Sequence, residues 1–264
     1  MTDSPVLYAV ADGVATITLN RPDAMNSLNV ATKEALLEAV TNAADEAEVR
    51  CVVLTGTGRA FCVGQDLKEH IAILRSSSSE ELFNTVDVHY NPTVTALATM
   101  PKPVIAAVNG VAAGAGASLA FACDFRILAE PAGFNLAFTG VALSCDTGSS
   151  WTLQRLVGRA KAIDLLYFPR TLASAESLEL GLASKVVPAD ELGAEVARLA
   201  ERLATGPTVA FGSIRRSVAF AAGAGFEDAL ACESKMMTLT GATQDHLAAV
   251  EAFIGKQNPV FRGR

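Results

Sequence analysis

The sequence predicts an α/β fold with a repeated β-β-α or βαβ core over residues 1–190 and a helical region over residues 191–264. Through the first part, short apolar runs that end in glycine or charge alternate with helical or loop segments, as in units with buried strands. After Pro188 the apolar residues keep only helical spacing. The chain has 264 residues, 50% of them hydrophobic, and is long enough to bury a sizeable core.

Elements of the core are expected in the following order. The segment GVATITLN, which starts at Gly13, alternates like a strand, and the loop NRPDAMNSLN follows it. A helix is expected over 30–46, because apolar residues recur there on one face. That stripe consists of Ala35, Leu36, Ala39, Val40 and Ala43. The apolar runs at 51–56, 103–110 and 124–130 predict further strands, buried within βαβ units.

In the helical region, helices are expected from Leu192 to Leu203 and at about 207–222, 226–240 and 243–254. These segments are rich in alanine and apolar on more than one side, which suits them to cover their own core or a neighbouring subunit. The serine run RSSSSEE at 75–81 is expected to form a mobile surface loop.

Composition and charge exclude several classes of partner. The net charge is −7 and the 21 Lys and Arg residues are scattered, so no basic patch indicates nucleic acid or an anionic membrane. No apolar run approaches the ~20 residues that cross a bilayer, and the N-terminal segment lacks the pattern of a signal peptide. We therefore expect a soluble, cytoplasmic protein.

Cysteine and histidine patterns favour neither disulfides nor a metal site. The five cysteines are an odd number without a C-x-x-C pair, which fits buried thiols in a reducing compartment. His70, His89 and His246 lie far apart in the sequence. We expect no metal.

Two glycine-bearing turns follow buried strands. In LTGTGRAFCVGQDL (54–67), glycines permit a tight turn and leave the amide of Val63 free to point outward. In VNGVAAGAGASLAFACD (108–124), a strand runs through Gly114 into a helix whose first amides lack helical partners and can bind negative charge. The alternative is that the glycines only make turns and tight packing. Neither stretch matches a phosphate loop, a dinucleotide fingerprint or a serine-hydrolase elbow.

Together these motifs resemble a known family. RPDAMNSLN, TGTGRAFCVGQDL, KPVIAAVNGVAAGAGASLAFACD, TLQRLVGRAKA and KQNPVF resemble, in order and spacing, the crotonase (enoyl-CoA hydratase/isomerase) superfamily along almost the whole chain. The resemblance implies a spiral of repeated ββα units with a C-terminal helical trimerisation region. It also implies a homotrimer or a dimer of trimers, a coenzyme A thioester as substrate, and no prosthetic group.

The resemblance also assigns binding residues. The two amides of the oxyanion hole fall on Val63 and Ala115, where they would stabilise an enolate oxygen; one such donor contributes ~2.7–4 kcal/mol in comparable sites. Positions that match the family's CoA-binding residues are Ala24, Ala60, Gln65, Asp66, Leu67 and Gly114, with Lys256 and Phe261 reaching CoA from a neighbouring subunit. A solvated tail is the alternative for the last two.

The catalytic assignment centres on Asp146. Hydratases of the superfamily use two glutamates, and the matching positions here hold Ser118 and Phe138, which argues against hydration. Asp146 matches the proton-shuttling aspartate of isomerases, and FNLAFTGVALSCDTGSSWTLQRLVGRAKA is most similar to the epoxyphenylacetyl-CoA isomerases of phenylacetate breakdown. Apolar surroundings supplied by Phe138, Leu143 and Trp151 would raise the pKa of Asp146 above ~3.9. The predicted function is that of an isomerase acting through a thioester enolate on an epoxyphenylacetyl-CoA or an enoyl-CoA.

Several alternatives stay open at this point. Asp146 is a favoured residue for the N-cap of the helix that follows it. A second alternative is that Asp146 acts as a nucleophile, like the aspartate of the aryl-CoA dehalogenases. Those enzymes also need a histidine, and His89 lies about two residues away from the matching position. A crotonase fold that binds acyl-CoA without catalysis is a third possibility. Residues 142–145 also depart from the isomerases' Gly-Leu-x-Pro, and Cys145 lacks a histidine partner in the sequence.

Overall fold

The computed structural model describes residues 4–76 and 78–264. The strands are β1 (Val6–Ala11), β2 (Val14–Leu19), β3 (Cys51–Gly56), β4 (Ala60–Cys62), β5 (Val104–Val108), β6 (Val111–Ala113), β7 (Phe125–Ala129), β8 (Gly133–Asn135), β9 (Thr171–Ala173) and β10 (Lys185–Val187). They form a six-stranded sheet, β1-β2-β3-β5-β7-β10, and a four-stranded sheet, β4-β6-β8-β9. Neighbouring strands are parallel except for the pairs β1/β2 and β8/β9.

Consecutive strands divide between the two sheets. β3, β5 and β7 enter the large sheet, and the strand after each, β4, β6 and β8, enters the small sheet. Helices follow β4 and β6, so the chain repeats a ββα unit as it winds. This arrangement confirms the repeated ββα core.

The helices are α1 (Val30–Asp45), α2 (Leu67–Leu74), α3 (Ser79–Thr85), α4 (Asn91–Thr99), α5 (Ala115–Phe121), α6 (Ser149–Val157), α7 (Arg159–Tyr167), α8 (Ser174–Glu179), α9 (Leu192–Ala204), α10 (Thr208–Ala221), α11 (Phe226–Gly241) and α12 (Gln244–Ile254). Short turns are η1 (Pro22–Ala24), the π-helical η2 (Val86–Tyr90) and η3 (Thr139–Val141). Within the described part of the chain, no helix is long and apolar enough to span a bilayer.

The hydrophobic pattern explains the core. β2 buries Ala15, Ile17 and Leu19 completely and turns the residues between them toward partly open surroundings, as its alternation predicts. β5 is buried along its whole length, since β3 and β7 flank it and α9 packs against it. The strands predicted at 51–56, 103–110 and 124–130 are therefore confirmed, and so is the helix expected over 30–46.

The serine run matches its prediction only in part. Ser76 and Ser78 are exposed and lie between α2 and α3, whereas the last residues of the run belong to α3. Ser78 is the N-cap of α3, and its hydroxyl accepts a hydrogen bond from the amide of Glu81 at 3.2 Å. Serine is a favoured cap residue, so the run leads into a helix where a surface loop was expected. Ser77 lies outside the described residues.

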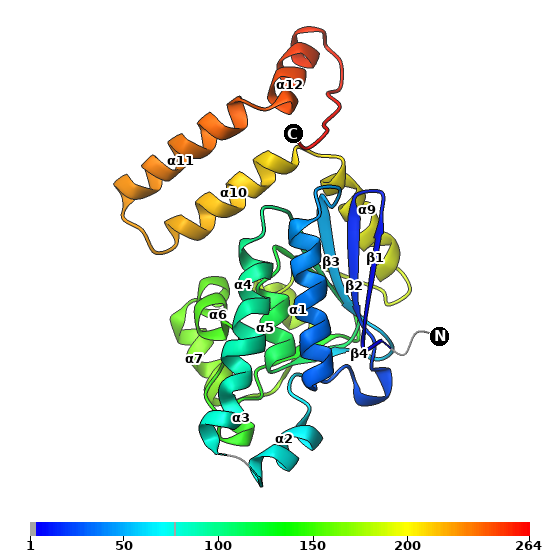
Figure 1. The fold of residues 1–264 in the computed structure, drawn as a ribbon, viewed down its shortest axis with the longest axis vertical. Helices are drawn as coiled ribbons and strands as arrows, with labels where there is room; N and C mark the ends of the chain where they lie inside the picture. Colours follow the sequence, from blue (N-terminus) through cyan, green and yellow to red (C-terminus); the bar gives the residue numbers. More distant parts are fainter. Residues whose placement is uncertain (1–3, 77) are drawn as a thin grey trace.

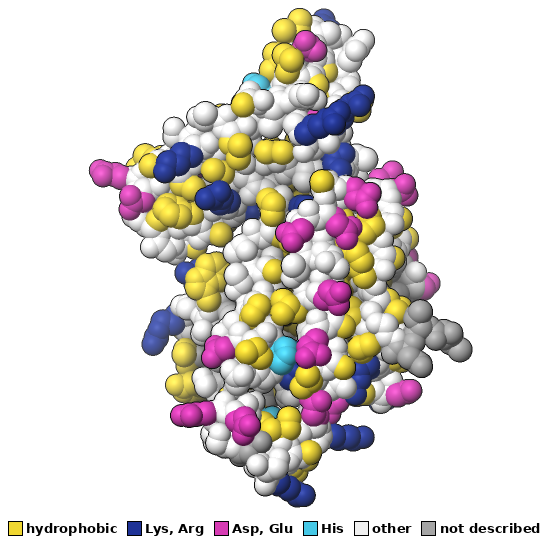
Figure 2. Space-filling view, viewed as in Figure 1, with side chains coloured by type: hydrophobic (Ala, Val, Ile, Leu, Met, Phe, Trp, Pro, Cys, Tyr) yellow, Lys and Arg dark blue, Asp and Glu magenta, His cyan; other side chains and the backbone are white. Residues whose placement is uncertain are grey.

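The C-terminal helices fall into two groups. α9 packs against strands of the large sheet, whereas α10 and α11 form an antiparallel pair that projects from the core and carries α12 at its end (Figure 1). Apolar side chains are exposed along this arm, and Figure 2 shows several over α11. The most exposed are Val218, Phe226, Met237, Phe253 and Ile254.

Candidate active site

The small sheet brings the two predicted glycine turns together. β4 and β6 are parallel neighbours, so the chain leaving β4 at Gly64 lies beside the chain leaving β6 at Ala115. Gly64 has a φ of +82°, and a Cβ added there would lie 2.9 Å from the carbonyl oxygen of Ala113 and 3.3 Å from the amide nitrogen of Ala115. Only glycine allows the two turns to approach this closely.

The amides at this junction differ in their hydrogen bonding. Ala115 begins α5 and is buried, and its N–H has no backbone partner among the described residues. The N–H of Val63 donates to the carbonyl of Met25 at 3.3 Å. The prediction that the amide of Val63 is free is therefore wrong. As an oxyanion donor, Val63 would have to give up this bond, and its assignment to the oxyanion hole stays a prediction.

The next free amide along the loop is that of Gln65. The carbonyl of Gly64 accepts from the amide of Leu28 at 2.8 Å, and the peptide bond that it shares with Gln65 is trans. The N–H of Gln65 therefore points away from Leu28, and within residues 4–76 and 78–264 no backbone group accepts it. Gln65 and Ala115 thus present two free amides at adjoining turns.

Asp146 lies on the loop between η3 and α6 and is half-buried. Burial raises the pKa of its carboxyl group, although the hydroxyl of Thr147 donates to Oδ1 at 2.9 Å and acts in the opposite direction. Burial also raises the pKa of Tyr90, and the charge of Asp146 adds to that shift. The carboxylate of Asp146 therefore acts electrostatically on a buried phenol.

The N-cap alternative for Asp146 is wrong. Gly148 occupies the N-cap of α6, which has no side-chain cap. Asp146 contributes its main-chain carbonyl, which accepts from the amide of Ser149 at 3.0 Å. Its carboxylate is left free of the helix amides of α6.

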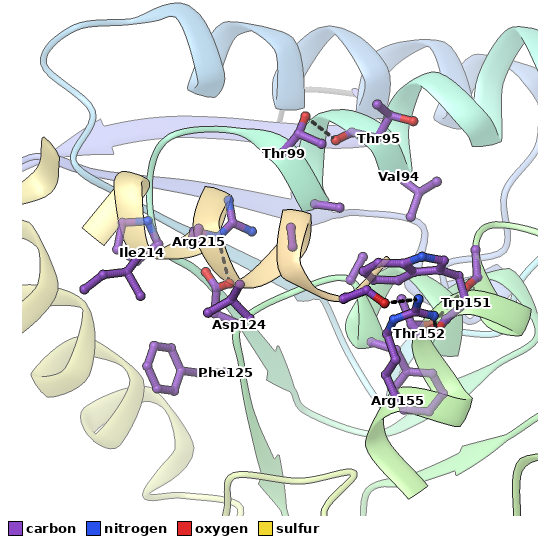
Figure 3. Close-up of a pocket in the computed structure, with 18 of the residues that line it drawn as sticks. Val94, Thr95, Thr99, Asp124, Phe125, Trp151, Thr152, Arg155, Ile214 and Arg215 are labelled. Carbon is purple, nitrogen blue, oxygen red and sulfur yellow. Dashed lines mark hydrogen bonds and ion pairs between the residues drawn. The ribbon is translucent and has the colours of Figure 1, made fainter. Parts of the chain in front are cut away.

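The predicted apolar surroundings of Asp146 are only partly present. Phe138 is buried, whereas Leu143 is 37% and Trp151 46% exposed to solvent. Ala142 adopts a left-handed conformation at the end of η3, directly before Leu143. Trp151 is stacked under the guanidinium of Arg155, 3.9 Å from its ring centre, in a neighbouring pocket (Figure 3).

That pocket, of about 690 Å³, lies between α4, α6 and α10. Its lining includes Gly148 and Trp151 but not Asp146. An ion pair between Arg215 and Asp124, 2.7 Å apart, ties α10 to the core at its wall (Figure 3). The pocket is therefore next to the candidate site and separate from its carboxylate.

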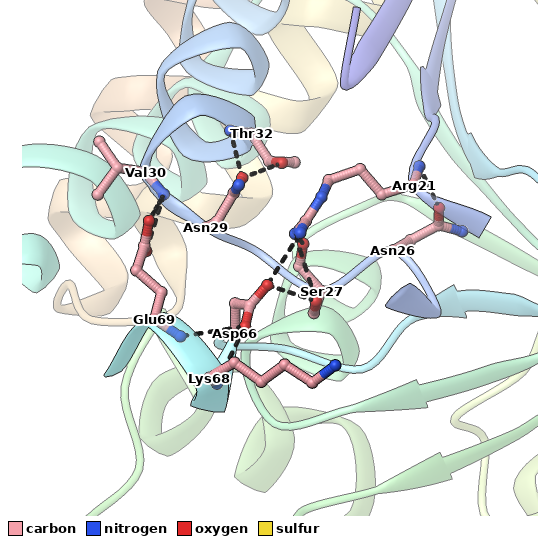
Figure 4. Close-up of polar contacts among 9 residues, drawn as sticks. All are labelled: Arg21, Asn26, Ser27, Asn29, Val30, Thr32, Asp66, Lys68 and Glu69. Atoms are coloured by element: carbon pink, nitrogen blue, oxygen red, sulfur yellow. Dashed lines mark hydrogen bonds and ion pairs between the residues drawn. The ribbon is translucent and has the colours of Figure 1, made fainter. Parts of the chain in front are cut away.

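A hydrogen-bonded cluster shapes the loops that should hold CoA (Figure 4). Asp66 caps α2 through the amides of Lys68 and Glu69, and its other oxygen accepts from Arg21 at 3.0 Å and from Ser27 at 3.1 Å. Burial alone would raise the pKa of Asp66, but the bonds from Arg21 and its neighbours hold it below its ordinary value. Asp66 thus organises the loop, and its carboxylate is already fully engaged.

The other expected CoA positions lie around this cluster. Ala24 ends η1, and the fully buried Ala60 accepts a hydrogen bond from Asn26 at 2.8 Å. Leu67 begins α2 and is 56% exposed, and Gly114 is the N-cap of α5. Their role in binding CoA stays a prediction.

Comparison with known proteins identifies the family. The model of the enoyl-CoA hydratase/isomerase family matches residues 9–264. The chain belongs to this family. The 1,2-epoxyphenylacetyl-CoA isomerase of Escherichia coli K12 is 39% identical over 259 residues, which cover 98% of each chain. The crotonyl-CoA hydratase of Syntrophomonas wolfei is 35% identical over 263 residues, 97% of each chain.

Solved structures agree with this assignment. The enoyl-CoA hydratase of Bacillus anthracis has a TM-score of 0.92 at 33% identity, over 98% of this chain and 100% of that one. The crotonase fold predicted for the chain is therefore confirmed. Because the enoyl-CoA hydratase/isomerase family contains both hydratases and isomerases, membership alone does not choose between the two reactions.

The positions that match the hydratase glutamates bear on that choice. Phe138 is buried, and Ser118 is completely buried, with its Oγ hydrogen-bonded to Oγ of Ser149 and 3.1 Å from the carbonyl oxygen of Gly114. Neither side chain carries a carboxyl group. The side chain at position 118 therefore supplies no catalytic acid, and its hydroxyl group joins α5 to α6 through Ser149.

Lys256 and Phe261 are not brought to the other site residues within one chain. α12 and the C-terminus lie at the opposite end of the molecule from α2 (Figure 1). The carbonyl of Phe261 accepts from Arg50 at 3.3 Å, and the carboxylate of Asp245 accepts from the amides of Arg262 and Gly263. Their proposed contact with CoA of a neighbouring subunit stays a prediction.

Sequence reasoning missed Lys33, Asn26 and Tyr90. Asn26 is completely buried at a φ of 56°, and its amide donates to the carbonyls of Thr57 and Ala60. Lys33 precedes Leu36 and Val40 by three and seven residues, on the buried face of α1. A charged residue in an apolar stripe was the signal for Lys33.

Proposed function

We propose that the protein is an isomerase of CoA thioesters that moves a proton, and with it a double bond, through a thioester enolate. The observation that carries the proposal is a half-buried carboxylate of raised pKa, Asp146, on a loop that Ser149 joins to the helix beginning at the free amide of Ala115. Such a carboxylate is a better base than one in water, and free amides stabilise developing negative charge on oxygen.

The reaction uses one base twice. The carboxylate of Asp146 takes a proton from a carbon atom of the acyl chain, and the electrons of the C–H bond move to the thioester oxygen. The amides of Ala115 and of the Val63–Gln65 loop donate to that enolate oxygen. The protonated Asp146 then returns the proton to a different carbon, the carbonyl re-forms, and the double bond has moved.

Hydration of an enoyl-CoA is disfavoured because that reaction needs both a catalytic base and a catalytic acid. Water must be oriented by a base while an acid delivers a proton to carbon. The two positions that would supply these carboxyl groups hold the buried Ser118 and Phe138. The similarity to the 1,2-epoxyphenylacetyl-CoA isomerase supports isomerisation, and we propose an epoxyphenylacetyl-CoA or a β,γ-enoyl-CoA as substrate.

Label exchange tests the proposal. Wild-type protein incubated with either substrate in deuterated water should incorporate deuterium into the acyl chain and form the isomer. Asp146→Asn should bind the thioester with unchanged affinity and lose about 10²–10⁴-fold in turnover, the usual contribution of a general base. A fully active Asp146→Asn variant would exclude the shuttle.

A nucleophilic Asp146 is the runner-up. It would require His89 to activate water, and the Nδ1 of His89 is hydrogen-bonded to Thr85 at 3.0 Å. A covalent acyl adduct on Asp146 after incubation with an aryl-CoA halide would favour this alternative.

We further propose a homotrimer, or a dimer of trimers, in the cytoplasm. The exposed apolar side chains on α10, α11 and α12 support assembly, because an isolated arm of this kind leaves its hydrophobic faces in water. Light scattering of the purified protein should give three or six times the mass of one chain, and a monomer would contradict the proposal.

A further inference from the structure

A buried lysine, Lys33, lies beside the candidate site. Lys33 is 3% exposed, and within the described part of the chain no carboxylate forms an ion pair with it. Its Nζ donates to Oγ1 of Thr85 at 2.7 Å and reaches Oε1 of Gln65 at 3.4 Å. Burying an ammonium group is costly, so its position requires a compensating interaction.

Tyr90 contacts the same oxygen atom. This tyrosine is 4% exposed and ends the wide π-helical turn η2, in which the amide of Asn91 bonds to the carbonyl of Val86. Its hydroxyl donates to Oε1 of Gln65, and the ammonium of Lys33 lies 5.5 Å from the centre of its ring. Two buried donors from α1 and η2 therefore converge on one side-chain oxygen in the loop after β4.

The main chain of Gln65 is held as well. The carbonyl of Gly64 and the amide of Asp66 both bond to Leu28, so the peptide between Gly64 and Gln65 is fixed on that side. With the side chain anchored by Lys33 and Tyr90, the free N–H of Gln65 has one available direction, away from Leu28. Gly64 alone could not supply this rigidity, because glycine is the most freely rotating residue.

We propose that Lys33 and Tyr90 are positioning residues that hold the side chain of Gln65 and so direct its main-chain N–H at the thioester carbonyl oxygen, beside the amide of Ala115. The inference rests on the proposed function, because it presupposes a thioester in this site. Misplacing a reacting group by about 1 Å can cost about 10²-fold in rate, so loss of the anchor acts on turnover more than on binding.

Tyr90→Phe tests the proposal with the removal of a single hydroxyl group. The probe is phenylacetyl-CoA labelled with ¹³C at the thioester carbonyl, whose resonance moves downfield when donors polarise the bound carbonyl. In Tyr90→Phe this movement should shrink and the rate of α-proton exchange should fall about 10-fold, with the dissociation constant within about twofold of wild type. Gln65→Asn, which shortens the anchored side chain by one methylene, should behave the same way.

The matched control is Tyr8→Phe, which removes a hydroxyl from β1 outside this network; its carbonyl shift and exchange rate should equal those of wild type. If wild type itself shows no downfield movement, the proposed oxyanion site fails and the inference fails with it. If wild type shows the movement and folded Tyr90→Phe and Gln65→Asn retain it in full, the oxyanion site stands and the positioning role is wrong.

Discussion

Ser118 and Ser149 share a hydrogen bond between their buried hydroxyl groups. Ser118 lies on α5, which begins at the free amide of Ala115, and Ser149 begins α6, three residues after Asp146. The bond therefore joins the segment that would polarise the carbonyl to the segment that carries the proposed base. Two buried serines thus tie together the two segments of the candidate site.

Ser118→Ala should lower both stability and turnover. It leaves the hydroxyl of Ser149 buried without its partner, which costs about 1–3 kcal/mol in the free energy of unfolding. Turnover should fall by up to about 10²-fold, because the loop of Asp146 loses its tie to α5. Urea denaturation and the label-exchange rate measure the two effects.

The double variant Ser118→Ala/Ser149→Ala provides the control. Replacing both partners removes the unsatisfied group, so the double variant should be less destabilised than the sum of the single variants. Strict additivity would show that the two hydroxyls do not interact.

As the pH is lowered, the rate of isomerisation should begin to fall at a higher pH than it would with a solvent-exposed aspartate as the base. Asp146 must be ionised to accept a proton, and burial raises its pKa above the ordinary value near 3.9. The acid limb of the pH–rate profile should therefore lie above that value and should be absent from the residual activity of Asp146→Asn. A limb at or below about 3.9 would show that the carboxylate is solvated in the working protein.

The sequence was sufficient to predict the helices and strands that are completely buried or that repeat a hydrophobic pattern over many residues. β5 and α1 followed directly from apolar runs and stripes, whereas the three-residue strands β4, β6 and β9 are too short to carry a period. β1 was not predicted, because its pattern of burial departs from strict alternation.

Those parts of the candidate site that belong to a sequence motif could be predicted, whereas the orientation of individual side chains could not. The meeting of the Gly64 turn with Ala115 follows from the family resemblance, which assigns both turns to one oxyanion hole. The outward orientation of Trp151 does not, because an aromatic residue fits a core or a pocket wall equally well. Lys33 and Tyr90 converge only through tertiary packing of α1 against η2, which no local pattern contains.

Asp146→Asn should stabilise the fold while it lowers turnover. The pKa of Asp146 is higher in the folded than in the unfolded chain, so its contribution to stability is full below the unfolded value and is lost as pH rises through the folded one. At neutral pH the buried charge is a net cost that an amide avoids. Thermal unfolding at pH 7 should give a higher Tm for the variant, with the difference shrinking near pH 4. Equal Tm values at both pH values would mean that burial does not act on this carboxyl group.

Gly64→Ala should disrupt the proposed oxyanion site. The added methyl group would lie 2.9 Å from the carbonyl oxygen of Ala113 and 3.3 Å from the amide of Ala115, at a φ of +82° that alanine adopts only under strain. We expect a loss of roughly 1–3 kcal/mol in the free energy of unfolding and of about 10²–10³-fold in turnover, as when one oxyanion donor is removed. Denaturant titration and label exchange measure these changes.

Gly193→Ala is the matched control for the added methyl group. It lies in the first turn of α9, an added Cβ would meet no atom within 4 Å, and helices favour alanine over glycine. This variant should therefore keep full turnover and unfold at a slightly higher denaturant concentration. Should Gly64→Ala also keep full turnover, then the close approach of Gly64 to Ala115 does not form the site that binds the carbonyl oxygen.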